Sequence, residues 1–233
     1  MDAHFLRRYV DARAQHPDTR RLETLLDFII PRPALHARFV NTLARLEYVG
    51  VRKMVKSRRA ERLDLDGLQH LLDEAVHALR LKKAAAALGS LAAAKVDVGT
   101  FSDADTLAGD AGEDYFQALD RRAEATLAGL GDDDDARAEA NYLLTSAAIE
   151  VRAQAFYPVY EQRLRAHGAP FSVATITKDE DRHLQEMSAR LLATLGRAPR
   201  DLDAVLAEEE VLYARFLDAA EAAAGMAKTA SAA

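Results

Sequence analysis

The motif Glu-x-x-His occurs twice in this chain, at Glu74/His77 and at Glu180/His183, and an aspartate comes directly before each glutamate. In an α-helix, residues three apart lie on the same face, so both side chains of each pair can bind the same ion. Carboxylate and imidazole groups are common ligands of divalent transition metals. The two pairs therefore predict a metal site.

Two single glutamates complete this pattern. Glu47 lies 27 residues before Glu74, and Glu150 lies 30 residues before Glu180. Such a separation suits two antiparallel helices of about 20 residues that meet near their middles. Both single glutamates lie in apolar runs of helical period, where an unpaired carboxylate is costly to bury. Because four carboxylates balance the charge of two divalent cations, the sequence predicts a two-metal site.

Each ligand taken alone has another interpretation. Glu180 could be the third residue of a helix capping box that begins at Thr177. His77 and His183 could be ordinary core or surface histidines, and Glu47 could pair with a nearby arginine. The six positions together nevertheless favour the two-metal site, because otherwise a separate explanation would be needed for each of them.

The composition restricts the other possibilities. The chain has 233 residues, no cysteine and a formal net charge of −6. It is long enough for one domain with a sizeable core, and it offers neither disulfides nor thiolate ligands. The acidic balance, without a basic stripe, argues against nucleic acid as a partner. Because we find no secretory segment and no apolar run of membrane-spanning length, we expect a cytoplasmic protein without a membrane partner.

Almost every segment has the pattern of a helix. The 6 prolines and 11 glycines lie mostly between periodic segments, and strand-like alternation is missing. We therefore predict an all-α fold with a connection over 91–111. The predicted helices cover 2–15, 18–30, 34–59, 64 or 66 to 88, 112–130, 132–167, 177–195 and 199–224. The helix over 132–167 has an acidic start at 132–135 and contains Pro158.

This arrangement of ligands on helix pairs resembles that of the ferritin-like di-iron and di-manganese carboxylate superfamily. The resemblance implies a single domain over 1–225 whose four-helix core covers about 34–195, with extra N-terminal, connecting and C-terminal helices and a disordered tail at 226–233. It implies two Fe ions as cofactors, or alternatively Mn or a mixed Mn/Fe pair, with one glutamate of each motif bridging them. The implied ligands are Glu47, Glu74 and His77 for one metal, and Glu150, Glu180 and His183 for the other.

The aspartates next to the ligand glutamates suggest an outer shell. A metal-bound imidazole usually donates its second N–H to a carboxylate, and in the superfamily this carboxylate often comes from the opposite helix. We therefore expect Asp179 to orient His77 and Asp73 to orient His183, although either aspartate could be a solvated helix residue. Arg182 could neutralise one of these acids or face water.

Further polar side chains lie near the expected site. His70 is one turn before the first motif, but a surface position is favoured for it. Tyr48, Tyr142 and Tyr157 could relay electrons or hydrogen-bond a ligand, although packing in the core is favoured. Gln154 could support a ligand or reach solvent.

The function is less well determined than the site. Small residues one turn from the ligand glutamates, Gly50, Ala147 and Ala153, would leave room for O2 or a substrate, or would allow close helix packing. We expect an O2-dependent oxidoreductase that acts on a small organic substrate and receives electrons from a donor protein. The alternatives are an iron-handling ferroxidase, a peroxide-detoxifying protein, and a structural protein stabilised by metal. The last helix, with a solvated face at 208–210, could mediate a homodimer.

Overall fold

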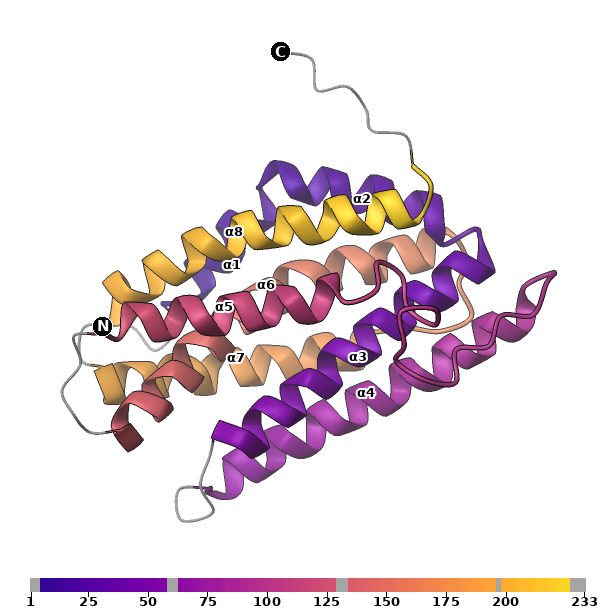
Figure 1. Cartoon of the computed structure of the whole chain (residues 1–233). Helices are drawn as coiled ribbons and strands as arrows, with labels where there is room; N and C mark the ends of the chain where they lie inside the picture. The colour runs from indigo at the N-terminus through magenta and orange to yellow at the C-terminus, as the bar shows by residue number, and fades with distance from the viewer. Residues whose placement is uncertain (1–4, 58–62, 129–133, 196–197, 227–233) are drawn as a thin grey trace.

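Helices make up most of the described part of the chain. The computed structural model describes residues 5–57, 63–128, 134–195 and 198–226. Over these ranges the chain forms eight α-helices and no strand (Figure 1). The prediction of an all-α fold is thereby confirmed.

Helices α3 (Pro33–Ser57) and α4 (Leu65–Leu91) run side by side in opposite directions (Figure 1). Asp64 caps α4, because its carboxylate accepts a hydrogen bond from the backbone N–H of Gly67 at 2.9 Å. The helix continues through Gly89, so the predicted end at residue 88 was three residues early.

Helices α6 (Asp134–Ala166) and α7 (Ala174–Leu195) form the second pair. The Glu161 carboxylate of α6 accepts a hydrogen bond from the backbone N–H of Val173 at 2.8 Å, directly before α7 begins. α6 remains continuous through Pro158, whose side chain is exposed.

The start of α7 settles one alternative. Because α7 begins at Ala174, three residues before the predicted start, Thr177 lies inside the helix and donates its hydroxyl to the carbonyl oxygen of Val173 at 3.3 Å. The interpretation of Glu180 as part of a capping box was therefore wrong.

The other four helices are α1 (Arg7–Ala14), α2 (Pro17–Ile29), α5 (Ala111–Thr126) and α8 (Ala198–Ala223). α8 lies along α5, and α2 lies beside α8 (Figure 1). Residues 92–110 contain no helix, as the sequence predicted for this connection.

A buried ionic network joins α1, α5, α6 and α8. Glu209 of α8 is fully buried. Its carboxylate accepts hydrogen bonds from Arg13 Nε at 3.0 Å and from Arg152 Nε at 2.7 Å. The Tyr115 hydroxyl donates a third bond at 2.7 Å. The prediction of a solvated face over 208–210 was thus wrong for Glu209.

Some predicted features lie outside the described residues: the helix ends at residues 59 and 130, the acids at 132 and 133, and the tail from 227. None of the described helices is long and apolar enough to cross a membrane.

Candidate metal centre

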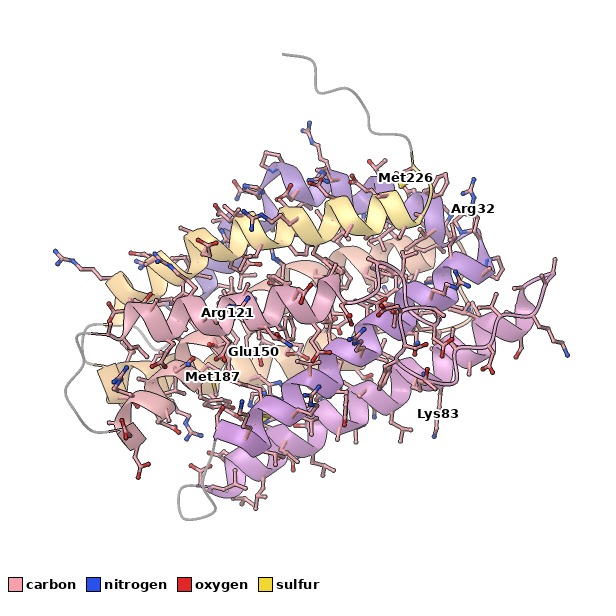
Figure 2. The ribbon with its side chains drawn as sticks, in the orientation of Figure 1. Arg32, Lys83, Arg121, Glu150, Met187 and Met226 are labelled. Carbon is pink, nitrogen blue, oxygen red and sulfur yellow. The ribbon has the colours of Figure 1, made fainter. Side chains whose placement is uncertain are left out.

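Seven buried side chains gather where α3, α4, α6 and α7 meet, and Glu150, labelled in Figure 2, is one of them. They form two groups, and within each group one ligand atom of every residue lies within 4.8 Å of the others. The first group is Glu47, Glu74, His77 and Glu180, and the second group is His70, Glu74, Glu150 and His183. Either group could hold a metal ion, and Glu74 is common to both.

Two imidazoles direct the same atom at the carboxylates. His77 Nδ1 lies 3.2 Å from Glu180 Oε1 and 3.7 Å from Glu47 Oε2. His183 Nδ1 lies 3.4 Å from Glu180 Oε2 and 3.5 Å from Glu74 Oε1. The i, i+3 spacing on α4 and α7 produces this convergence, and it leaves each Nε2 free to face an outer partner.

The outer partners have the crossed arrangement that the sequence predicted. His77 Nε2 lies 3.1 Å from Asp179 Oδ2, and His183 Nε2 lies 3.4 Å from Asp73 Oδ2. Each aspartate thus belongs to the helix opposite its histidine. Arg182 forms an ion pair with Asp73 and is only partly exposed, so it neutralises an outer acid. Such partners fix the tautomer and the orientation of a ligating imidazole.

His70 belongs to the second group. The prediction that favoured a surface position for this histidine was wrong. His70 is buried, and its Nε2 lies 3.3 Å from Glu150 Oε1 and 3.4 Å from Glu74 Oε1. Its ring stacks on that of His183 with a centroid distance of 3.8 Å. Burial, with the nearby charge of His183, lowers the pKa of His70 to about 3, so the imidazole is neutral and available as a ligand.

Two of the acids, Glu74 and Glu150, are too close to other carboxylates to remain ionised without a cation. Burial and the charges of Glu47 and Glu180 raise the pKa of Glu74 well above its ordinary value. Burial and the charge of Glu180 also raise the pKa of Glu150. Burial would raise the pKa of Glu180 too, but hydrogen bonds from Glu150 and from the imidazoles of both Glu-x-x-His motifs outweigh it and hold that pKa well below its ordinary value. Burial would lower the pKa of His77, but Glu180 and Glu47 outweigh it and raise that pKa to about 11. Bound protons therefore offset part of the negative charge that divalent cations would neutralise.

Unpaired atoms at the centre agree with this interpretation. Among the described residues, Glu150 Oε2 and His77 Nδ1 are buried without a hydrogen bond of acceptable geometry. One atom belongs to each group, and both are good metal ligands in their deprotonated forms. The donor set therefore fits a resident metal.

The remaining candidate side chains are not all at the centre. The Tyr157 hydroxyl donates a hydrogen bond to Glu47. Gln154 donates instead to the carbonyl oxygen of Thr177 at 3.0 Å, which ties α6 to α7 one turn before Glu180. Tyr48 is 45% exposed and stacks on Phe101, so it is not brought to the ligands. Tyr142 is buried in the wall of an adjoining cleft.

Two hollows adjoin the centre. The apolar cavity has a volume of about 90 Å³ and lies between α3, α5, α6 and α8, with Glu47, Glu74, Glu150 and Glu180 in its wall. The outer cleft has a volume of about 1130 Å³ and runs between α3, α4, α5 and α6 to the second group. The two walls share five residues: Gly50, Glu74, Phe116, Ile149 and Glu150. Of the three predicted small positions, Gly50 and Ala153 line the apolar cavity.

Comparisons of the chain with protein-family models, curated proteins and solved structures gave no match. No family is thereby shown. The resemblance to ferritin-like proteins stays a prediction that rests on the ligand pattern.

Gly50 provides a test of the centre's geometry. A Cβ at this position would lie 3.0 Å from Glu74 Oε2, so Gly50→Ala should displace the carboxylate that both groups share. We expect the affinity for Mn(II), measured by equilibrium titration, to fall about tenfold, the lower end of losses seen when the support of a ligand is disturbed.

Gly112→Ala is the matched control. Its Cβ would meet Leu46 Cδ2 at the same 3.0 Å, but it faces apolar atoms rather than a ligand. Equal losses of affinity in the two variants would show that general strain, and not the contact with Glu74, is responsible.

Proposed function

We propose that this protein is a ferritin-like di-iron oxidoreductase that uses O2 to oxidise a small organic substrate. One observation carries the proposal: the cluster of seven carboxylate and imidazole side chains lies beside an apolar cavity, and the four glutamates of the cluster line that cavity. A metal site that serves only for stability needs no such cavity beside its ligands.

The ligands divide between two iron ions by their group. Glu47 and His77 would hold one ion, and His70, Glu150 and His183 the other. Glu74 would bridge them, because it belongs to both groups. Glu180 would be the second bridge, since its two carboxylate oxygens face His77 and His183 respectively. This division keeps Glu74 and Glu180 as the implied bridging glutamates and adds His70 to the implied ligands.

When bound, a pair of ferrous ions would supply two electrons to O2 and the organic substrate the other two, and an external electron donor would return the irons to the ferrous state. The surrounding residues have separate tasks. Asp179 and Asp73 hold the two imidazoles in place, and the Tyr157 hydroxyl holds the Glu47 carboxylate. The apolar wall of the cavity limits the access of bulk water to the reacting atoms.

The charges of the outer cleft favour an organic substrate over iron handling. An iron-entry path should present unpaired acids that attract Fe(II). Three of the five described acids that line the cleft outside the metal centre are instead paired: Glu113 with Arg45 and Arg52, Asp120 with Lys53, and Glu124 with Arg137. The cleft also carries basic residues in its wall, among them Lys56 and Arg121.

Metal content and O2 reactivity test the proposal together. The protein is loaded anaerobically with Fe(II), iron per chain is measured by plasma mass spectrometry, and O2 is then admitted while the absorption spectrum is recorded. We expect two irons per chain and a single, stoichiometric O2-dependent transition. Continued uptake of many irons would identify an iron-storage protein, and absence of bound iron with tight binding of manganese would move the proposal to a di-manganese centre. Absence of any bound metal would overturn it.

A further inference from the structure

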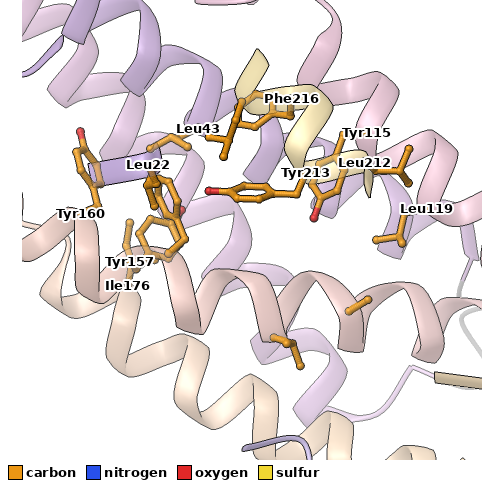
Figure 3. Packing of buried hydrophobic residues seen from close by; sticks show 14 of the residues in the cluster. Leu22, Leu43, Tyr115, Leu119, Tyr157, Tyr160, Ile176, Leu212, Tyr213 and Phe216 are labelled. Carbon is orange, nitrogen blue, oxygen red and sulfur yellow. The ribbon is translucent and has the colours of Figure 1, made fainter. Parts of the chain in front are cut away.

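The apolar cavity has a second polar feature, distant in sequence from the metal ligands. Part of its wall consists of aromatic rings from α5 and α8, including Tyr115, Tyr213 and Phe216. Figure 3 shows Tyr213 extending from α8, with its hydroxyl directed away from Tyr115 toward the side of the core where Leu43 and Tyr157 lie. Leu43 and Tyr157 line the same cavity.

The Tyr213 hydroxyl is the unpaired one among the three tyrosines of this wall. Tyr115 donates to Glu209 at 2.7 Å, and Tyr157 donates to Glu47. The Tyr213 side chain is 3% exposed, and its hydroxyl has no hydrogen-bond partner within the described part of the chain. A buried hydroxyl without a partner costs about 1–3 kcal/mol. A ligand that accepts a hydrogen bond would recover this cost.

Neighbouring charges define what the ligand can be. Among the described residues that line the cavity, Arg152 is the only cation, and both its Nε and one Nη donate to Glu209 at 2.7 and 2.9 Å. Its guanidinium lies 3.8 Å from the centroid of the Tyr213 ring and fixes that ring by a cation–π contact. With the arginine charge already matched, the cavity has no cation for an anionic substrate group. Burial raises the pKa of Tyr213, so the phenol keeps its proton and acts as a donor.

The size of the cavity limits the part of the substrate that enters it. Its volume of about 90 Å³ is smaller than the ~150 Å³ apolar cavity known to accept benzene, so the cavity holds only part of a ring-bearing substrate. Because Gly50, Phe116 and Ile149 line both hollows, a longer molecule could extend from the cavity into the outer cleft.

Building on the proposed function, we propose that the apolar cavity binds a neutral substrate with a ring-sized apolar part and one hydrogen-bond acceptor, which Tyr213 recognises. Tyr213 is then a specificity residue: it anchors one end of the substrate and leaves the apolar part beside the carboxylate cluster. The cation–π contact with Arg152 and the fixed neighbours keep the donor in position before the substrate arrives.

The test compares two probes of similar size, 4-fluoroanisole and 1-ethyl-4-fluorobenzene, which differ by an ether oxygen in place of a methylene group. Dissociation constants are measured by fluorine NMR titration on zinc-loaded protein, because zinc occupies a carboxylate and histidine site without redox chemistry. In Tyr213→Phe, we expect the dissociation constant of 4-fluoroanisole to rise about fivefold relative to that of 1-ethyl-4-fluorobenzene. This change corresponds to the loss of one net hydrogen bond. Tyr115→Phe is the matched control, since its hydroxyl is engaged by Glu209 and should leave the ratio unchanged.

The ratio within each protein cancels changes in cavity shape that affect both probes. An unchanged ratio in Tyr213→Phe, an equal shift in Tyr115→Phe, or failure of the wild type to bind either probe would overturn the inference. Zinc per chain is measured in every sample and the titration is repeated on metal-free protein. Failure of the metal centre therefore appears as missing zinc, and failure of this inference appears as an unchanged probe ratio.

Discussion

Glu74→Ala should reduce the stoichiometric metal content of the chain from two ions to none. Glu74 is the one residue that both groups share, so its loss removes a ligand from each position and one of the two proposed bridges between them. Anaerobic loading with Fe(II) followed by mass-spectrometric metal analysis measures this directly. Glu47→Ala and Glu150→Ala, each confined to one group, should affect chiefly one position, which would leave about one ion per chain.

Stability measurements separate this effect from misfolding. Burial and neighbouring acids raise the pKa of Glu74, so its ionised form destabilises the folded metal-free protein, and this destabilisation increases as the pH rises above the unfolded-state pKa of about 4.3. The metal-free Glu74→Ala variant should therefore melt at a temperature equal to or above that of the metal-free wild type at neutral pH. Asp66→Ala, an exposed position on the same helix, should retain both metals. Retention of two ions by Glu74→Ala would show that the ligand assignment is wrong.

Glu209→Ala should destabilise the fold by about 3–5 kcal/mol, the usual cost of removing one partner from a buried ion pair. The substitution leaves the guanidinium groups of Arg13 and Arg152 inside the protein without the carboxylate that neutralises them. It also removes the acceptor of the Tyr115 hydroxyl. Equilibrium unfolding in urea of the metal-free protein gives the difference in unfolding free energy.

Glu210→Ala is the control for this variant. Glu210 also pairs with Arg13, but its side chain is 38% exposed, so water can replace the interaction. We expect a loss below about 1 kcal/mol, as for other surface ion pairs. Similar losses for the two variants would mean that the network contributes through packing rather than through charge.

The clustering of the six predicted side chains could be foreseen because their spacing obeys local rules. The i, i+3 spacing of each Glu-x-x-His motif is set by the helix itself, and a single glutamate in an apolar run is costly unless it has a partner. These two arguments led to Glu47, Glu74 and Glu150 before any tertiary contact was known. The crossed aspartates followed from the general need of a ligating imidazole for an outer acceptor.

His70 was missed because, in the first half of α4, polar side chains are buried while several leucines are exposed. The buried face of α4 carries His70, Glu74 and His77, whereas Leu68 and Leu72 are about half exposed. Apolar periodicity therefore points to the wrong face of this helix. The available signal was the spacing: His70 lies one turn before Glu74, on the face that the motif had already marked as functional.

Glu209 was missed for a different reason. Three consecutive glutamates on a helix ordinarily face water, and nothing nearby in sequence indicates a buried partner. Its partners are distant, since Arg13 lies 196 residues away and Arg152 lies 57 residues away. Only the packing of α8 against α1 and α6 brings these charges together, and that packing is a property of the whole chain.

The division of the ligands between two helix pairs has a mechanical consequence. The backbones of α4 and α7 come close to each other at few positions, yet their side chains meet in the same cluster. A metal ion held between them is a cross-link between chain segments about a hundred residues apart. Because the ligands are brought together only in the folded chain, the free energy of metal binding adds to the stability of the fold. Loss of metal should therefore first separate the α3–α4 pair from the α6–α7 pair. Protection of α4 amides against hydrogen exchange, compared with and without metal, would measure how strongly metal binding holds the two pairs together.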